Sequence, residues 1–291
     1  MREGFVTTDA GRLWYAAYGE GKKGTPLLVM HGGPGFLSMT ETVDQLADER
    51  PVYFYDQLGC GRSERAADTS AYSPEGYVAE LDVVRKVLGL DEAVLMGFSW
   101  GAMLTCLYML ERKRSGIKHG GIKGLVLCGP YLSTPLWDAD QRAHVARLPA
   151  ATRAAIEAGE RAQDYGPAYQ EATMAFYRRH LCCLDPWPAF VAAAVTQLNM
   201  DVYMTLWGPS EFTITGTLKD YDLAPLLGDI DVPVLLTCGD RDEAAPATVQ
   251  QFQRTFPNAA LCVLPNAAHL HQIEQPALFL GAVRGFLSRI A

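Results

Sequence analysis

A serine between two glycines constrains this chain more than any other feature. Residues 97–101 read Gly-Phe-Ser-Trp-Gly, after the apolar run 93–96 and before the helix-forming run 102–112. Small residues on both sides of a serine permit a sharp turn from a strand into a helix, at which the hydroxyl of Ser99 stands exposed. The five letters alone are common, so the strand and helix around them carry the prediction of a nucleophilic serine.

Short apolar runs alternate with segments of helical period along most of the chain. This alternation is typical of an α/β protein with a mostly parallel central sheet covered by helices. Between about 134 and 215 it stops, and alanine-rich helical stretches without a clear strand take its place. We therefore expect an α/β core formed by residues 1–133 and 216–291, and a helical cap inserted at residues 134–215.

The individual elements follow from the same periodicities. Expected strands are residues 13–18, 27–30, 52–55, 93–96, 125–128, 232–238 and 260–264. Expected helices are residues 74–88, 102–112, 138–148, 150–162, 165–180 and 188–200.

Charge excludes some partners. The 291 residues include 25 basic and 33 acidic ones, a formal net charge of −8, which argues against nucleic acid or an anionic membrane surface as the main partner. The N-terminus lacks the apolar core of a signal peptide, and no stretch approaches the roughly 20 apolar residues of a membrane span. We expect a cytoplasmic protein.

The seven cysteines form no Cys-x-x-Cys pair and no regular framework. We interpret them as buried reduced thiols, not as metal ligands or disulfides. Cys60 stands apart because it lies in a glycine-rich loop. Neither a cofactor nor a metal is expected.

A serine hydroxyl needs a neighbouring base that a third group orients. In an α/β-hydrolase the acid and the histidine follow the serine in the chain, at the ends of late strands. The expected strand 232–238 leads into Gly239 and three acids. We choose Asp242 over Asp240 and Glu243, because it lies three residues beyond Gly239 and can turn back toward a histidine.

The base is expected just past the strand 260–264. His269 lies there with small residues before it, and His271 is a nearby competitor. The remaining histidines outside the glycine-rich turn lack such a placement: His119, His144 and His180.

The turn His-Gly-Gly-Pro-Gly, residues 31–35, follows the expected strand 27–30. Acyl transfer creates an oxyanion that needs backbone N–H donors, one from the residue after the serine and one from a loop after an early strand. Trp100 and Gly33 are the expected donors, and a side chain on the first two glycines would crowd the substrate carbonyl. His31 is expected to support the turn.

These motifs together resemble the proline iminopeptidases, or prolyl aminopeptidases, and the similar amino-acid amidases of the α/β-hydrolase superfamily. The resemblance spans nearly the whole chain and rests on residues 31–35, on Asp-Gln-Leu-Gly-Cys-Gly-Arg-Ser at 56–63, on residues 97–101, and on Asp242 followed by His269. It implies a serine hydrolase that releases an N-terminal amino acid, proline or a small or apolar residue, through an acyl-enzyme. The implied substrate is a small peptide or amino-acid amide with a free α-amine.

Two further matches lie in the insertion. Asp-Pro-Trp-Pro at 185–188 is similar to the cap motif of these peptidases, and Gly-Pro-Ser-Glu-Phe at 208–212 to a segment of the tricorn-interacting aminopeptidases. That resemblance implies that Glu211 and Glu243 bind the substrate's amino group. Without it, both would be interpreted as solvated surface acids. Ala102 departs from the glycine that many relatives carry, which weakens an assignment to a strictly proline-specific member.

Aromatic residues near these motifs are expected to form an apolar wall around the substrate's N-terminal side chain, or to be cap core: Phe36, Trp100, Tyr203 and Trp207. Two alternatives to the aminopeptidase stay open, an amidase or esterase with little peptidase activity and a non-catalytic ligand receptor. Epoxide hydrolases and dehalogenases are disfavoured because they place aspartate where Ser99 stands. The sequence specifies no oligomeric state, and a monomer is compatible with it.

Overall fold

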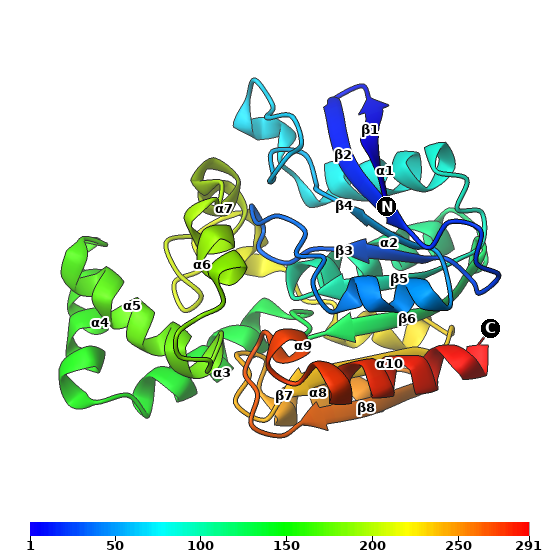
Figure 1. Cartoon of the computed structure of the whole chain (residues 1–291). Helices are drawn as coiled ribbons and strands as arrows, with labels where there is room; N and C mark the ends of the chain where they lie inside the picture. The colour runs from blue at the N-terminus through cyan, green and yellow to red at the C-terminus, as the bar shows by residue number, and fades with distance from the viewer. Residues whose placement is uncertain (291) are drawn as a thin grey trace.

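Six neighbouring strands are parallel in an eight-stranded sheet in the computed structural model, which describes residues 1–290 (Figure 1). The order across the sheet is β1-β2-β4-β3-β5-β6-β7-β8. The α/β architecture with a mostly parallel sheet, which the alternating pattern predicted, is thus confirmed. The strands are β1 (Arg2–Thr8), β2 (Gly11–Tyr18), β3 (Leu27–Met30), β4 (Val52–Tyr55), β5 (Ala93–Phe98), β6 (Ile122–Cys128), β7 (Val234–Gly239) and β8 (Ala259–Leu264).

One edge of the sheet is antiparallel. Strand β2 pairs antiparallel with both β1 and β4. The sequence analysis did not predict β1, in which only Val6 is fully buried. An edge strand of this kind offers little apolar alternation for a sequence pattern to detect.

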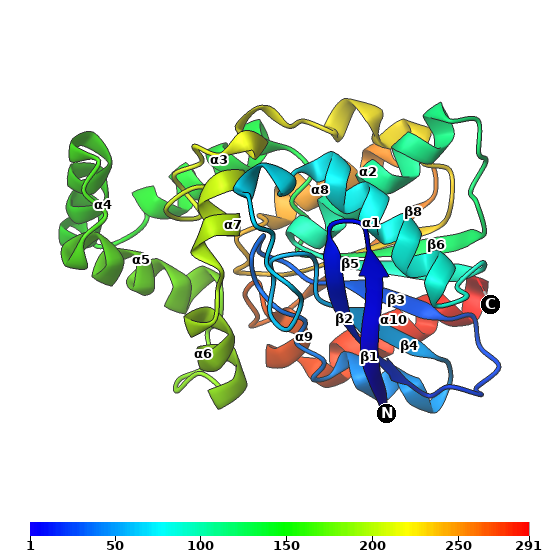
Figure 2. The same cartoon turned by 90° about the horizontal axis from the view of Figure 1, so that it is seen from above.

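Helices cover both faces of the sheet (Figures 1 and 2). Successive strand residues point to opposite faces, so Leu28 and Met30 enter one apolar cluster while Leu27 and Val29 enter the other. The first cluster lies under α1 (Pro74–Val87), α2 (Trp100–Arg114) and α8 (Pro246–Thr255). The second lies under α10 (Pro276–Ile290) and the 3-10 helix Val43–Asp48.

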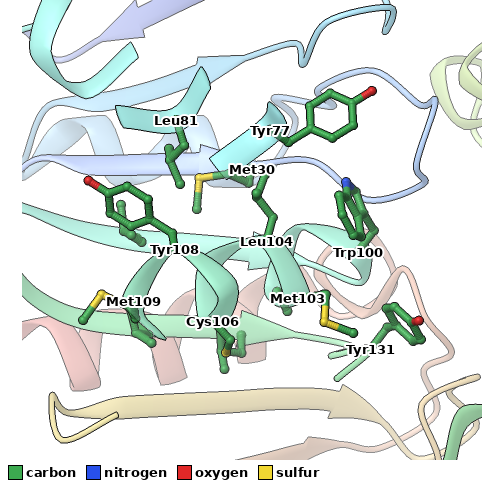
Figure 3. Packing of buried hydrophobic residues seen from close by; sticks show 14 of the residues in the cluster. Met30, Tyr77, Leu81, Trp100, Met103, Leu104, Cys106, Tyr108, Met109 and Tyr131 are labelled. Carbon is green, nitrogen blue, oxygen red and sulfur yellow. The ribbon is translucent and has the colours of Figure 1, made fainter. Parts of the chain in front are cut away.

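Helix α2 is the centre of the larger cluster (Figure 3). Its residues Trp100, Met103 and Leu104 are fully buried beside Met30 of β3 and Tyr77 of α1. Complete burial of one such aliphatic side chain contributes about 1.5–3 kcal/mol. This packing fixes the start of α2, where the catalytic serine was expected.

The insertion is helical, and α4 and α5 lie farthest from the sheet (Figures 1 and 2). The single helix expected at 188–200 is wrong, because the chain breaks between two helices. Asn199 caps the second one by accepting a hydrogen bond from Asp201 N–H, and its amide donates to the carbonyl of Gly59 at 2.7 Å. The division into core and cap domains stays a prediction. The helices are α3 (Thr134–Ala146), α4 (Ala150–Ala162), α5 (Pro167–His180), α6 (Ala189–Thr196) and α7 (Met200–Leu206).

Candidate active site

Ser99 occupies the sharp turn between β5 and α2. Its backbone has φ 51° and ψ −116°, a strained conformation for a residue with a side chain. A Cβ on Gly97 would collide with the carbonyl oxygen of Gly101, and one on Gly101 would collide with that of Met30. Both glycines of the motif are therefore required by the close approach of helix and strands.

The ends of the central strands bring distant parts of the chain together. Phe98 of β5 is in register with Cys128 of β6, and Cys128 is in register with Thr237 of β7. Because the carboxyl ends of these parallel strands are level, the loops that follow them meet at one edge. Ser99 and the acid and histidine loops lie at this edge.

Asp242 and His269 form a hydrogen-bonded pair. Nδ1 of His269 lies 2.6 Å from Oδ1 of Asp242, and both side chains are buried. Backbone N–H groups fix the carboxylate, because Ala244 donates to Oδ1 at 2.9 Å and Gly239 donates to Oδ2 at 3.0 Å. With both oxygens held, the carboxylate can orient the imidazole.

The charges of this pair are strongly coupled. Burial alone would raise the pKa of the Asp242 carboxyl, but the charge and hydrogen bond of His269 hold that pKa well below its usual range. Burial alone would lower the pKa of His269, but the charge and hydrogen bond of Asp242, followed by the charges of Glu243 and Glu211, raise it to about 9. The neighbouring carboxylates therefore favour the protonated form of the imidazole, and neutralising one of them would lower the pKa of His269.

The glycine-rich turn lies against the serine. A Cβ on Gly32 would come within 3.2 Å of the Ser99 Cβ. Gly33 has φ +117°, and a Cβ there would lie 2.8 Å from the backbone nitrogen of Phe36. Both glycines line the same cavity as Ser99, so no side chain stands between the turn and a substrate carbonyl.

His31 joins this turn to the rest of the site. Its Nδ1 donates to the carbonyl of Gly32 at 2.7 Å, and its Nε2 accepts from the N–H of Gln57 at 3.0 Å. Burial lowers the pKa of His31, which suits the neutral ring that this pattern requires. Gln57 in turn accepts a hydrogen bond from the Trp100 indole at 2.8 Å. The structural role expected for His31 agrees with these contacts.

Glu211 and Glu243 approach the cavity from the cap and the core. Tyr203 donates a hydrogen bond to Oε1 of Glu211 at 2.6 Å, whereas the buried Oε1 of Glu243 has no partner among the described residues. Burial raises the pKa of both carboxyls, and the charge of Glu211 raises the pKa of Glu243 further. A buried carboxyl without a partner is costly in its charged form, and either protonation or a neighbouring cation relieves that cost.

One cavity contains most of the residues expected to form the site. Phe36 lines it, as expected for the apolar wall. Trp100, Tyr203 and Trp207 are buried and are not among its lining residues, which agrees with the alternative that their side chains belong to the core. The Trp100 side chain points to Gln57, Tyr203 lies behind Glu211, and the Trp207 indole donates to the Ser210 carbonyl. The lining includes Gly32, Gly33, Phe36, Ser99, Glu211, Glu243 and His269, with apolar residues Leu37, Met39, Phe98, Leu181, Val191, Val195 and Leu270.

Several known proteins are similar to this chain in sequence and fold over nearly their whole length. The alpha/beta hydrolase fold family matches residues 25–276. Proline iminopeptidase from Heyndrickxia coagulans is 35% identical over 294 residues, 99% of each chain. The crystal structure of VinJ has a TM-score of 0.92 at 32% identity, covering 100% of this chain and 99% of that one. The crystal structure of the Mycobacterium smegmatis proline iminopeptidase has a TM-score of 0.87 at 33% identity, covering 99% and 98%. The chain belongs to the proline iminopeptidase family of α/β-hydrolases.

Helix α3 of this proline iminopeptidase family member donates hydrogen bonds to the backbone carbonyls of both glutamates. Trp137 and Gln141 lie one turn apart on α3. The Trp137 indole donates to the Glu211 carbonyl at 3.1 Å, and the Gln141 amide donates to the Glu243 carbonyl at 2.9 Å. Sequence reasoning missed both, although their four-residue spacing places them on one face of a helix.

Gly129 and His271 are two more residues that sequence reasoning did not assign to this site. A Cβ on Gly129 would lie 2.8 Å from two ring atoms of His269, and Gly129 has φ +51°. His271 is fully buried, with Nδ1 3.5 Å from Oδ2 of Asp242. The glycine directly after an expected strand was the available signal for the first of these residues.

Among residues 1–290, no group of three or more His, Cys, Asp or Glu side chains is arranged to hold a metal ion. Cys60 is buried, and burial raises the pKa of its thiol well above the usual range, so it is a poor nucleophile. None of the helices within these residues has the length and apolar character that a membrane span requires.

Proposed function

We propose that this protein is a serine aminopeptidase that releases an N-terminal residue from small peptides or amino-acid amides with a free α-amine. Curated relatives that are 32–35% identical are named proline iminopeptidases. That name supports proline as a substrate residue, and the largely apolar cavity lining suits proline or another small apolar residue.

The observation that carries the proposal is the pair of carboxylates beside the nucleophile. Glu211 and Glu243 line the cavity that also contains Ser99 and His269. The buried, unpartnered oxygen of Glu243 offers a charge-assisted hydrogen bond to an α-ammonium group. An acetylated amine carries no charge and would leave this carboxylate unpaired, so the site favours free amines.

In the proposed cycle, the Ser99 hydroxyl oxygen attacks the carbonyl carbon of the first residue while His269 accepts the hydroxyl proton. The N–H groups of Gly33 and Trp100 stabilise the oxyanion. His269 then donates its proton to the departing amine, which leaves an ester between the amino acid and Ser99. Water attacks this ester with His269 again as base, and the amino acid is released.

Substrate binding also prepares the base. The two glutamates contribute to the raised pKa of His269. An α-ammonium group bound beside them would offset their charge and lower the pKa of His269 in the complex, which favours the form of the ring that accepts a proton. The amine clamp thus couples substrate recognition to activation of Ser99.

A panel of proline, alanine and leucine p-nitroanilides and amides, each free and N-acetylated, tests the proposal. We expect turnover of the free compounds, slow or absent turnover of the acetylated ones, and none with Ser99→Ala. Equal turnover of both series would rule out the amine clamp. Turnover of amides and simple esters without dipeptides would favour the amidase or esterase alternative, and no turnover at all would favour a ligand receptor.

A further inference from the structure

A second imidazole faces the acid of the triad. His271, at the start of α9 (His271–Glu274), is fully buried, and its Nδ1 lies 3.5 Å from Oδ2 of Asp242. On the other side of the ring, Nε2 lies 2.9 Å from the Thr237 hydroxyl. The ring of Phe279 packs edge-on against it at 5.7 Å. His271 therefore has a fixed position between a strand residue and the carboxylate.

The chemistry of the neighbours fixes the tautomer. An ionised carboxylate accepts hydrogen bonds and cannot donate one. Favourable contact with Asp242 therefore requires a proton on Nδ1 of His271, and in the neutral ring Nε2 is then an acceptor for the Thr237 hydroxyl. No other described group takes up Nδ1, so this N–H acts on Asp242 alone.

The two imidazoles act on different oxygens of one carboxylate. His269 takes Oδ1 at 2.6 Å, and His271 faces Oδ2. At 3.5 Å the second contact is longer than a standard hydrogen bond, so its effect is mainly electrostatic. It adds to the backbone N–H groups of Ala244 and Gly239, which hold the same two oxygens, and it favours the negative charge of the carboxylate.

We propose that His271 is a positioning residue of the catalytic triad, which holds the Asp242 carboxylate in the orientation that directs Oδ1 at His269. This role rests on the proposed function for the reaction that the triad performs, and on the position of His271 beside Asp242 for the way in which it acts. It assigns a role to a residue that touches neither substrate nor Ser99.

Two substitutions separate positioning from packing. In His271→Asn the side-chain amide nitrogen replaces Nδ1 and faces Asp242. In His271→Gln the longer amide replaces Nε2 and reaches the Thr237 hydroxyl, so only the contact with Asp242 is lost. His119→Asn is the matched control, because His119 lies far from the site beside Asp231.

We expect His271→Gln to lower kcat on alanine p-nitroanilide about tenfold, the usual effect of losing a polar contact to a charged group. KM should change less than twofold, and Tm should stay within a few degrees. His271→Asn should recover most of kcat, and His119→Asn should match the wild type. Unchanged kcat in His271→Gln, or an equal loss in both variants, would overturn the proposal.

The rate at which a fluorophosphonate modifies Ser99 supplies a second readout that needs no peptide substrate. We expect this rate to be lowest in His271→Gln, mostly recovered in His271→Asn, and equal to that of the wild type in His119→Asn. If no aminoacyl substrate is turned over, the proposed function fails, and the order of labelling rates still decides the role of His271. Equal labelling rates in wild type and His271→Gln would reject that role.

Discussion

At the scale of single residues, Glu243 has a feature that is unfavourable for folding and that the proposed amine binding would use. Its side chain is buried, one oxygen has no partner among the described residues, and burial together with Glu211 raises its pKa. Burial thus disfavours the charged form of this carboxyl, and the charge of His269 opposes that effect. In the proposed complex, an α-ammonium group would stabilise the charged form further.

Replacement of this carboxylate by an isosteric amide should stabilise the unliganded protein at alkaline pH. A carboxyl whose folded pKa is raised binds protons more tightly when folded, so the free energy of unfolding falls as the pH rises above about 4.5 toward that raised pKa. We expect Glu243→Gln to unfold at about 1–3 kcal/mol higher free energy at pH 8 and to match the wild type at pH 5. Denaturant unfolding of both proteins at both pH values measures this difference. A wild type with a higher free energy of unfolding than Glu243→Gln at pH 8 would contradict the prediction.

The same substitution should change the titration of the base. Loss of a nearby negative charge lowers the pKa of His269, which the neighbouring carboxylates help to raise to about 9. The acid limb of Ser99 modification by a fluorophosphonate should move down by about one pH unit in Glu243→Gln. An unchanged limb would show that Glu243 exerts no charge effect on His269.

Sequence reasoning at this scale succeeded where backbone order decides. Chain order and strand ends led to Asp242 and His269, which the structure joins by a 2.6 Å hydrogen bond. It left two alternatives open where the direction of a side chain decides, the wall of the cavity and the buried core. Trp207 packs edge-on against Tyr131 at 4.7 Å, away from the cavity, and a sequence does not reveal which way an aromatic ring turns.

At the scale of elements, the loop after β6 sets the space for the histidine. Gly129 donates its N–H to the Thr237 carbonyl at 2.7 Å and lies directly against the His269 ring.

The short apolar strands were predicted well, because buried parallel strands are nearly continuous apolar runs. No prediction covered α10, in which Gly281 and Gly285 lower helix propensity and the burial of Phe279 and Val283 compensates.

Gly129→Ala tests this spacing. The added methyl group would come within 2.8 Å of the His269 ring, in a backbone conformation that disfavours side chains. We expect kcat to fall about 100-fold, since displacement of a catalytic group by about 1 Å has an effect of that order.

Gly281→Ala is the control for this substitution, because an added Cβ there meets nothing within 4 Å. Its kcat should match the wild type, and its helix should gain up to about 1 kcal/mol. If Gly129→Ala retains wild-type kcat, the loop after β6 does not restrict the imidazole.

At the scale of the whole molecule, the proposed site depends on segments that lie far apart in the chain. Ser99 and Glu243 come from loops at the strand ends, whereas Glu211 comes from the segment after α7. Asn199 ties α7 to the core through Gly59 and Gly35. Local patterns predicted the elements but not this docking, because the docking depends on hydrogen bonds between residues far apart in the chain. The N–H of Asn199, for example, donates to the carbonyl of Gly35, which lies 164 positions earlier.

Asn199→Ala should loosen this docking. It removes the buried bond to Gly59 and the helix cap, each a contribution of about 1 kcal/mol. We expect a lower Tm together with a raised KM for free-amine substrates, because Glu211 is then held less firmly. Thr196→Ala, on the exposed surface of α6, is the control. A change in Tm without any change in KM would separate this docking from substrate binding.

Glu211 and the buried Glu243 are proposed to select a free α-ammonium group together. The ratio of kcat/KM for alanine p-nitroanilide to that for its N-acetyl derivative measures this selection directly. In Glu243→Gln we expect the ratio to fall at least 100-fold, since loss of one partner of a buried charge pair costs about 3–5 kcal/mol. Glu211→Gln should act in the same direction. An unchanged ratio in both variants, with intact folding, would contradict the account.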